Sequence, residues 1–426
     1  MTLSRRAFLG LSTQGLLLSA CKLVPPQHPA LKKARVLVVG GGFGGLNVAR
    51  AIKRLAPECQ VTLIDRNLSY TRCLGSNWVI GGFASEQGLQ QDLSLPLAAD
   101  NIPLRVGEVV RVSHNPQRLY LAEGETLPFD RLILSPGIDF RWDQVRGMSE
   151  SLSRQIPHAY KGGQAGLLAH QIKNMRQGGT LIITAPQNPY RCPPGPYERA
   201  SLVAAYFKQH NPTAKILILD AKSRFSKQKA FTAAWDRYYP GMIEWISNET
   251  EGEMDHVDTR KRTVHMAFNR FQADVLNVIP PQKAGRLGEQ LGLTDASGWC
   301  DVDPMTFESK RYPNIHVIGD AATIGPMPKS AFAAQAQARA CAVAVIQSLL
   351  ERPPIEPRLI NHCYSLIDQS HAISITGVYG FKRGSKELIT LSQGETPPGA
   401  LGEIEAAEAY GWYQLILEQT FGSQGS

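Results

Sequence analysis

The chain has 426 residues, and its 45 lysines and arginines exceed its 37 aspartates and glutamates, giving a formal net charge of +8 at pH 7. That charge is modest for the length, and the basic runs lack the interleaved aromatic residues of a nucleic-acid groove, so we expect no nucleic-acid partner. The seven cysteines form no Cys-x-x-Cys pair, which argues against a zinc site or a c-type haem on this chain. A chain of this length can bury the cores of two or three domains.

Residues 1–21 are predicted to be an export signal. Ser4–Leu9 resembles the twin-arginine motif, and the apolar stretch Ala7–Ala20 is shorter than the ~20 predominantly apolar residues that span a bilayer. Leu18–Cys21 looks like a lipoprotein cleavage box, which predicts an acyl chain on Cys21; a plain cleaved signal with a chance cysteine is the alternative. We expect a protein exported folded to the periplasm, with membrane attachment through lipidated Cys21.

The segment that follows has the pattern of a βαβ unit that opens a dinucleotide-binding domain. Arg35–Val39 is predicted to be a buried strand, Gly40–Gly45 the turn after it, and Leu46–Leu55 a helix. Val61–Asp65 is the next strand. Glycines allow the tight turn, the approach of a pyrophosphate and the helix–strand contact, and an acidic residue ending the second strand holds the adenosine ribose. The residues assigned to these roles are Gly40, Gly42, Gly45 and Asp65.

Two later segments have the pattern of flavin-binding strands. Phe129–Gly137 is a strand that runs into a turn of small residues. Asn314–Ala321 is a strand whose final aspartate is expected to bond the ribityl or pyrophosphate part of FAD. A long alanine-rich helix then begins after a lysine, which is expected on the O2 side of the flavin ring near the positive end of that helix. The contacts predicted from these segments are Gly137, Gly319, Asp320 and Lys329.

The return of flavin-type sequence after an interruption indicates that one domain is inserted in another. We expect an α/β protein with two Rossmann-like, three-layer domains, the second inserted in the first, and a smaller C-terminal α+β domain. The predicted boundaries are 32–146 and 280–353 for the FAD-binding domain, 147–279 for the inserted domain and 354–426 for the C-terminal domain.

The inserted domain has a cysteine where a second glycine-rich turn would be expected. Its first strand and helix flank a turn that holds Arg191, Cys192, Pro193, Pro194 and Pro196. Prolines remove backbone N–H donors and fix φ, so this turn is a poor cradle for phosphate oxygens. The pattern favours a flavin enzyme whose reductant reacts with a thiol, and it weakens the alternative of an NAD(P)H dehydrogenase.

Several motifs together resemble the flavoprotein subunit of flavocytochrome c sulfide dehydrogenase, within the wider disulfide-dependent sulfide:quinone reductase group. The resemblance covers nearly the whole chain after the signal. Its most specific pieces are RCPPGPYERAS, IPPQKAGRLGEQLGLTDASGWC, TFES, HVIGDA, PMPKS and NHCYSLI. It implies an enzyme that oxidises hydrogen sulfide to sulfur or polysulfide and passes electrons through FAD to a c-type cytochrome.

The resemblance also implies roles for single residues. Cys73, in the segment Tyr70–Cys73, corresponds to the cysteine that carries FAD through a thioether, although Arg72 differs from the family pattern; a free thiol beside a non-covalent flavin is the alternative. Cys192 and Cys363 correspond to the redox-active disulfide, which hydrosulfide would open to a persulfide and a thiolate.

Two further assignments keep their alternatives. Glu198 is either the general base for hydrogen sulfide or a carboxylate that favours a helix N-terminus. Trp412 and Tyr413 either face the cytochrome or pack in the core.

Other functions also stay open. A quinone-linked sulfide reductase needs an apolar surface that lies on the membrane, whereas Gly402–Gly422 carries four glutamates and no basic residue, which does not suit an anionic lipid surface. A flavin-binding subunit without turnover is a third possibility. The presence of both Cys192 and Cys363, the cysteines of the redox-active pair, argues against it.

Overall fold

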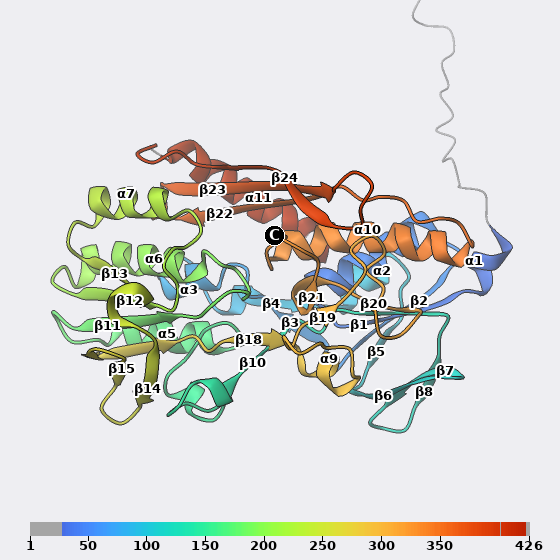
Figure 1. Ribbon diagram of the computed structural model, residues 1–426, viewed down its shortest axis with the longest axis horizontal. Helices are drawn as coiled ribbons and strands as arrows, with labels where there is room; N and C mark the ends of the chain where they lie inside the picture. The colour runs from blue at the N-terminus through green and yellow to red at the C-terminus, as the bar shows by residue number, and fades with distance from the viewer. Residues whose placement is uncertain (1–27, 401, 423–426) are drawn as a thin grey trace, which may run out of the picture.

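The computed structural model describes residues 28–400 and 402–422, so the predicted signal and Cys21 lie outside the described residues. Two α/β units lie side by side, and a unit of antiparallel strands with a helix lies across both (Figure 1). None of the described helices is both long and apolar enough to cross a membrane.

The first unit is a parallel five-stranded sheet with the strand order β20-β9-β1-β2-β5. Its strands are β1 (Arg35–Val39), β2 (Gln60–Asp65), β5 (Leu104–Val106), β9 (Arg131–Leu134) and β20 (Ile315–Val317). β1 pairs in parallel with β2 on one side and β9 on the other, so the strand order reverses there. In sheets of this kind a ligand binds beyond the carboxyl ends of the strands at that reversal.

The helices α2 (Phe43–Leu55) and α10 (Ala331–Leu349) pack against each other beside this sheet. α2 begins three residues earlier than the predicted Leu46, because Gly42 is its N-cap and the last two glycines of the turn belong to its first turn. The free N–H groups of that turn therefore point out from the carboxyl end of β1, where an anion can accept them.

The second unit is a parallel four-stranded sheet with the order β13-β12-β11-β17. Its strands are β11 (Thr180–Ala185), β12 (Lys215–Asp220), β13 (Ile243–Ser247) and β17 (Val275–Val278), and its helices are α5 (Gln164–Lys173), α6 (Gly195–His210) and α7 (Gln228–Tyr238). The chain passes between the two units through β10 (Ile138–Phe140) and β18 (Gln282–Ala284), which pair antiparallel.

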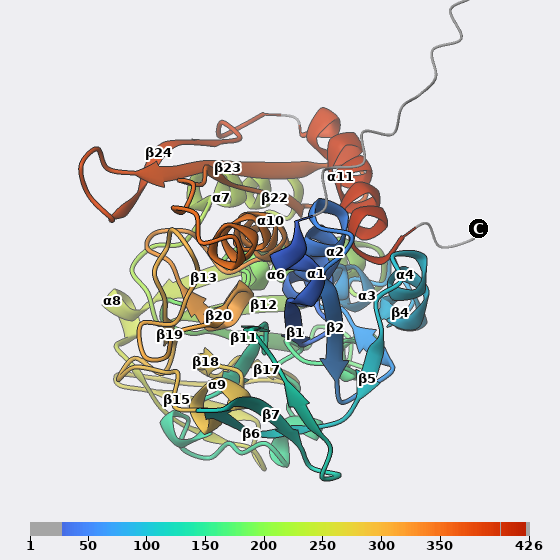
Figure 2. The same cartoon turned by 90° about the vertical axis from the view of Figure 1, so that its right-hand side faces the viewer.

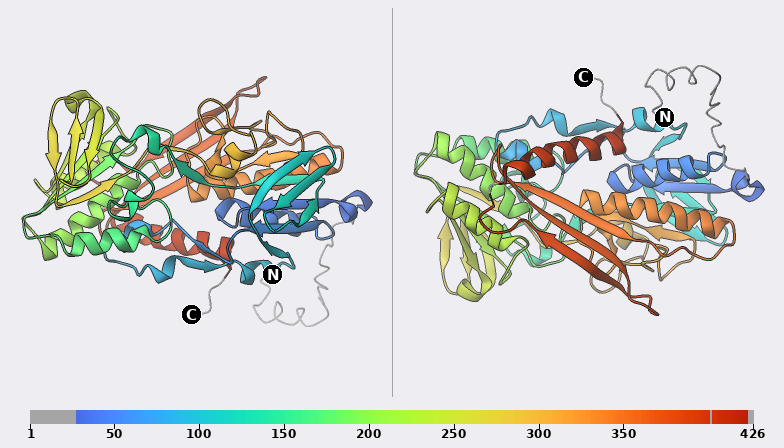
Figure 3. Two further views of the ribbon diagram at one scale, coloured as in Figure 1. Left: turned by 90° about the horizontal axis from the view of Figure 1, so that it is seen from below. Right: turned by 90° about the horizontal axis from the view of Figure 1, so that it is seen from above.

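The third unit consists of β22 (Leu359–Leu366), β23 (Ala372–Phe381), β24 (Leu388–Glu395) and α11 (Glu403–Phe421). β22 contacts α10 of the first unit and α6 of the second, and α11 contacts α2. The strands lie over α10 in Figure 2, and the view from above in Figure 3 shows them running across both units. The predicted fold class, two Rossmann-like units with a C-terminal α+β unit, is confirmed.

The described fold also contains shorter α-helices and strands. The helices are α1 (Pro29–Lys33), α3 (Ser76–Ile80), α4 (Ser94–Ala99), α8 (Asn248–Glu251) and α9 (Arg286–Gln290). The strands are β3 (Ser69–Thr71), β4 (Gln90–Asp92), β6 (Val109–His114), β7 (Gln117–Leu121), β8 (Thr126–Pro128), β14 (Met254–Asp258), β15 (Thr263–Met266), β16 (Arg270–Gln272), β19 (Cys300–Asp301) and β21 (Ala322–Thr323).

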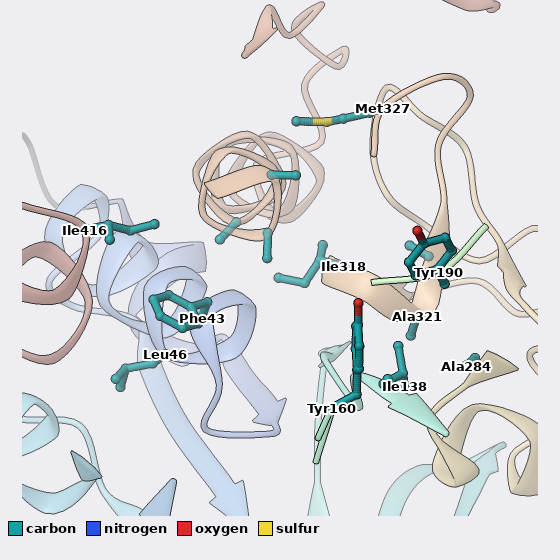
Figure 4. Packing of buried hydrophobic residues seen from close by; sticks show 14 of the residues in the cluster. Phe43, Leu46, Ile138, Tyr160, Tyr190, Ala284, Ile318, Ala321, Met327 and Ile416 are labelled. Carbon is teal, nitrogen blue, oxygen red and sulfur yellow. The ribbon is translucent and has the colours of Figure 1, made fainter. Parts of the chain in front are cut away.

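A continuous hydrophobic core joins the three units. Phe43 and Leu46 of α2, Ile318 after β20 and Ile416 of α11 belong to one buried cluster, which also contains Tyr160 and Tyr190 (Figure 4). Burial of apolar surface contributes about 25 cal/mol per Å², so a cluster of this extent resists relative movement of the units. The site between them is built on fixed elements.

Candidate functional site

A cavity of about 800 Å³ extends from the turn after β1 to the start of α6 and to β22. Its size is within the range of pockets that enclose a small molecule or cofactor. It is lined by most of the residues predicted from the sequence. These are Gly40, Gly42, Asp65, Cys73, Gly137, Cys192, Glu198, Gly319, Asp320 and Cys363.

The end of the cavity at β1 has the shape of a pyrophosphate cradle. Gly40 has φ 104°, and a Cβ there would lie 2.5 Å from the carbonyl oxygen of Ser135. Gly45 does not line the cavity, but a Cβ at this position would overlap the carbonyl oxygen of Gly40, so glycine is required for α2 to approach the turn. Asp65 ends β2, and its Oδ2 accepts a hydrogen bond from the N–H of Gly41 at 2.7 Å. These residues fit the adenosine diphosphate part of FAD.

The middle of the cavity contains Asp320, Arg191 and Cys73. The Arg191 Nε–H bonds Oδ2 of Asp320 at 2.6 Å, and its Nη1 lies 3.0 Å from the sulfur of Cys73. Oδ1 of Asp320 is buried, and none of the described residues donates a hydrogen bond to it. An unpaired buried carboxylate oxygen beside a cavity fits a hydroxyl donor of a bound molecule, as the ribityl chain of FAD would supply. The residues present therefore fit the cofactor.

The structure corrects the prediction for Lys329. Its amine does not face the cavity but donates to the carbonyl oxygens of Asp320 and Ala322, both at 2.8 Å, and lies 3.8 Å from the ring centre of Trp299. Burial lowers the pKa of Lys329 to about 8. These two carbonyl contacts mean that the lysine supports the loop after β20, and Lys329 is not among the residues that line the cavity.

The turn that carries Cys192 is held in an unusual backbone conformation. Cys192 has φ 54°, in the left-handed region that residues other than glycine rarely adopt. Its N–H donates to the carbonyl oxygen of Lys329 at 2.8 Å, and its carbonyl oxygen accepts from Gly195 at 2.8 Å. A Cβ at Gly195 would lie 2.7 Å from the hydroxyl of Tyr160 and 3.3 Å from the sulfur of Cys192. The strained turn and the glycine together leave room for the thiol at the start of α6.

The second predicted cysteine lies on β22 and faces the same cavity. Cys363 is half-buried, and its sulfur is 3.5 Å from Oδ1 of Asn361. Asn361 also accepts a hydrogen bond from the hydroxyl of Ser330, which caps α10. All the cysteines in the described part of the chain are free thiols, so the bridge between Cys192 and Cys363 remains a prediction.

Glu198 connects the elements that carry the two cysteines. Its Oε2 accepts from Nδ2 of Asn77 at 2.8 Å, and its Oε1 accepts from the backbone N–H of Leu366 in β22 at 3.0 Å. Burial raises the pKa of Glu198 above the usual carboxyl range, and these two donors oppose that rise. The carboxyl group therefore has a pKa moved toward neutral pH, and it lines the same cavity as both thiols.

The nucleotide position of the second unit is filled by protein. Asp220 ends β12 as Asp65 ends β2, yet it is fully buried. Its carboxylate bonds the hydroxyl of Tyr197 at 2.5 Å, the ring N–H of Trp245 at 2.9 Å and the amine of Lys222 at 2.6 Å. With its oxygens bound in this way, Asp220 is not free to hold a ribose. The second unit therefore lacks both the glycine turn for a pyrophosphate and a free carboxylate for a ribose.

The two aromatic residues considered from the sequence lie differently. Tyr413 is buried, stacks on Trp78 with ring centres 4.2 Å apart and bonds Arg72, so it packs in the core. Trp412 lines the cavity and stacks on Phe332 with ring centres 6.3 Å apart.

Arg191 and Asn77 were not predicted from the sequence to have a role. Arg191 stands in a quoted motif next to Cys192, and Asn77 follows the quoted segment Tyr70–Cys73 by four residues, so proximity to these cysteines was the available signal. Asp220 was missed because no glycine-rich turn precedes it, whereas the turn Gly40–Gly45 marks Asp65.

Comparison with known families matches three parts of the chain. Residues 165–280 match the model described as the central part of the sulfide dehydrogenase (flavocytochrome c) flavoprotein chain, and residues 355–421 match the flavin-binding model of flavocytochrome c sulphide dehydrogenase. Residues 34–167 match the pyridine nucleotide-disulphide oxidoreductase model. A sulfide dehydrogenase flavoprotein chain from Chlorobaculum thiosulfatiphilum is 44% identical over 45 residues, 11% of this chain and 94% of that relative.

The chain belongs to the sulfide dehydrogenase flavoprotein family. The chain is also similar to more distant sulfide-oxidising flavoproteins. The mitochondrial sulfide:quinone oxidoreductase of Mus musculus is 24% identical over 316 residues, 71% of this chain and 68% of the relative. The crystal structure of the Aquifex aeolicus sulfide:quinone oxidoreductase superposes with a TM-score of 0.69 at 15% identity, covering 92% of this chain and 96% of that chain, which shows the shared fold.

Proposed function

We propose that the protein is an FAD-dependent sulfide dehydrogenase that oxidises hydrogen sulfide to sulfur or polysulfide through Cys192 and Cys363 and passes electrons to a c-type cytochrome. The observation that carries this proposal is that both thiols and the Glu198 carboxyl group line the same cavity as the dinucleotide cradle. The filled nucleotide position around Asp220 supports sulfide, and not NAD(P)H, as the reductant.

The first chemical step uses groups of this chain. Glu198 takes a proton from hydrogen sulfide, and the hydrosulfide sulfur forms a bond to one sulfur of the Cys192–Cys363 bridge. The bridge breaks, and its other sulfur leaves as a thiolate. FAD, when bound, accepts an electron pair and releases it one electron at a time, as a haem acceptor requires.

The turn after β1 and Asp65 would hold the adenosine diphosphate of FAD, and Asp320 the ribityl chain. We propose that Cys73 forms a thioether to the flavin. The position of its sulfur in the cavity, 3.0 Å from Nη1 of Arg191, supports this.

The electron acceptor has two candidates. The family models name flavocytochrome c, which supports a cytochrome, whereas the mouse and Aquifex relatives are named as quinone oxidoreductases. On α11, Ile404 is 74% exposed and Leu415 is 52% exposed among exposed glutamates. An acidic face of this kind suits a basic protein partner better than an anionic lipid surface. The proposal includes export to the periplasm by the twin-arginine route, with lipid attachment at Cys21.

Replacing Cys73 by serine tests the covalent linkage. We expect acid-denatured wild-type protein to retain yellow flavin on the polypeptide, whereas the Cys73→Ser protein releases it, because serine forms no thioether. Absorbance and peptide mass measure the linkage, and Cys192→Ser is the matched control that keeps the flavin attached. Release of all flavin from the wild-type chain would contradict the linkage.

Anaerobic stopped-flow absorbance tests the reductant and the acceptor. We expect sulfide, but not NADH, to bleach the flavin, and ferricytochrome c to restore the colour faster than a soluble quinone.

Cys192→Ser and Cys363→Ser should each slow the bleaching by roughly three orders of magnitude, since the two sulfurs act as a unit. Cys341→Ala, which removes a thiol from the core of α10, should keep the native rate. Rapid bleaching by NADH, or a native rate in either serine variant, would overturn the proposal; faster reoxidation by quinone would favour the second acceptor.

Substitution of Glu198 by glutamine tests the general base. We expect kcat/KM for sulfide near neutral pH to fall by about 10²–10⁴-fold. Burial raises the pKa of Glu198, so the base becomes protonated at a higher pH than an ordinary carboxyl group does. As the pH is lowered, the wild-type rate should therefore begin to fall while the pH is still above the usual carboxyl pKa. The deficit of the variant should narrow at high pH, where hydrosulfide is already formed. Glu249→Gln, an exposed carboxyl in α8, is the control, and a deficit that is constant across pH would argue for a purely structural role.

A further inference from the structure

One buried ammonium takes no part in the mechanism described so far. Lys227 is the N-cap of α7, its φ is 61°, and it is only 1% exposed. The left-handed region favours glycine or asparagine, the N-terminal end of a helix disfavours a cation, and burial of a lysine is unfavourable without a partner. Three unfavourable features at one position indicate that a nearby group with negative charge compensates for them.

The amine of Lys227 lies against the strand that carries Cys363. It donates to the hydroxyl of Ser365 at 2.7 Å and to the carbonyl oxygen of Ile373 at 3.5 Å. These acceptors are uncharged oxygens, so they satisfy donors without neutralising the charge. Ser365 and Cys363 are two residues apart on β22, and side chains alternate along a strand, so both lie on the same face. The ammonium is therefore on the face from which the Cys363 thiol projects.

The same face holds Cys363 between two fixed polar groups. Ser330 bonds Asn361 on one side of the cysteine, and Lys227 bonds Ser365 on the other. Both Asn361 and Ser365 are almost fully buried. The thiol is thus held on a strand that is anchored from α10 and from α7.

Cys363 and Lys227 each influence the pKa of the other. Burial raises the pKa of the Cys363 thiol, and Lys227 is the strongest influence that opposes the rise. Burial lowers the pKa of Lys227, and Cys363 leads the groups that oppose it. The other titratable or charged groups that face the pair from the packed elements are Cys192, Glu198, Arg199, His362, Tyr379 and Glu395.

We propose that Lys227 is the counter-cation of the Cys363 thiolate and thereby determines how readily the Cys192–Cys363 bridge is reduced. This inference rests on the redox role proposed for the pair. Two electrons and one proton convert the bridge into one thiol and one thiolate, with loss of the S–S bond. Lys227 keeps its own proton and stabilises the thiolate on Cys363, which makes it a positioning residue that acts through the cysteine.

The test measures the thiol directly in reduced holoprotein without sulfide. Alkylation of Cys363 by iodoacetamide is followed by peptide mass spectrometry across pH in wild type, Lys227→Met, Lys227→Arg and Lys229→Met. An opposite charge nearby shifts a pKa by about 1–3 units, so Lys227→Met should slow alkylation of Cys363 at least about tenfold at neutral pH. Alkylation of Cys192 should change less, Lys227→Arg should restore most of the rate, and Lys229→Met, an exposed lysine on α7, should match wild type.

Redox titration against a dithiol couple gives a second readout. Loss of the cation should shift the equilibrium about tenfold toward the bridged form, which corresponds to a potential about 30 mV lower. If Lys227→Met does not fold, Lys227→Gln takes its place. Native alkylation and potential in the charge-free variant would overturn the inference while leaving the proposed function intact. A wild-type protein that forms no Cys192–Cys363 bridge would instead defeat the proposed function.

Discussion

The site depends on the attachment of β22 to α6 through one buried carboxyl group. Glu198 accepts hydrogen bonds from Asn77 and from the backbone of Leu366, so a residue of the first unit and a strand of the C-terminal unit meet at a helix of the second. A buried carboxylate is tolerated only when such donors replace water. This junction joins the helix that follows Cys192 to the strand that carries Cys363, and both cysteines line the cavity beside it. The group that positions the two sulfurs is also the group best placed to accept a proton from the substrate.

The two parallel sheets show how one architecture serves two chemistries. At the end of β2, Asp65 faces a glycine turn and can receive a nucleotide. At the equivalent end of β12, Asp220 is enclosed by Tyr197, Trp245 and Lys222, and the turn before α6 presents a thiol. Function is set by the side chains at the carboxyl ends of the strands and not by the fold.

The sequence predicted the architecture well because its signals were local. A strand, a glycine turn and an acidic residue within one βαβ unit identify a dinucleotide site, and the structure places Gly40 and Asp65 accordingly. That Cys192 and Cys363 share a site was predicted from family resemblance alone, since it depends on how β22 packs against α6. Lys329 was misplaced because its distance from the glycine–aspartate turn says nothing of side-chain direction, and the carbonyls of Asp320 and Ala322 attract its amine. Lys227 carries no sequence signal, because its role arises from a strand more than a hundred residues away.

The proposed mechanism requires that two sulfurs from distant parts of the chain form a bond that sulfide opens. A non-reducing peptide map of the oxidised holoprotein, after the remaining free thiols are blocked by alkylation, tests it most directly. We expect a linked pair of peptides that contain Cys192 and Cys363, and its replacement by two separately alkylated peptides after anaerobic addition of sulfide. Separate alkylation of both cysteines in the oxidised protein, or a bridge from either one to another cysteine, would contradict it.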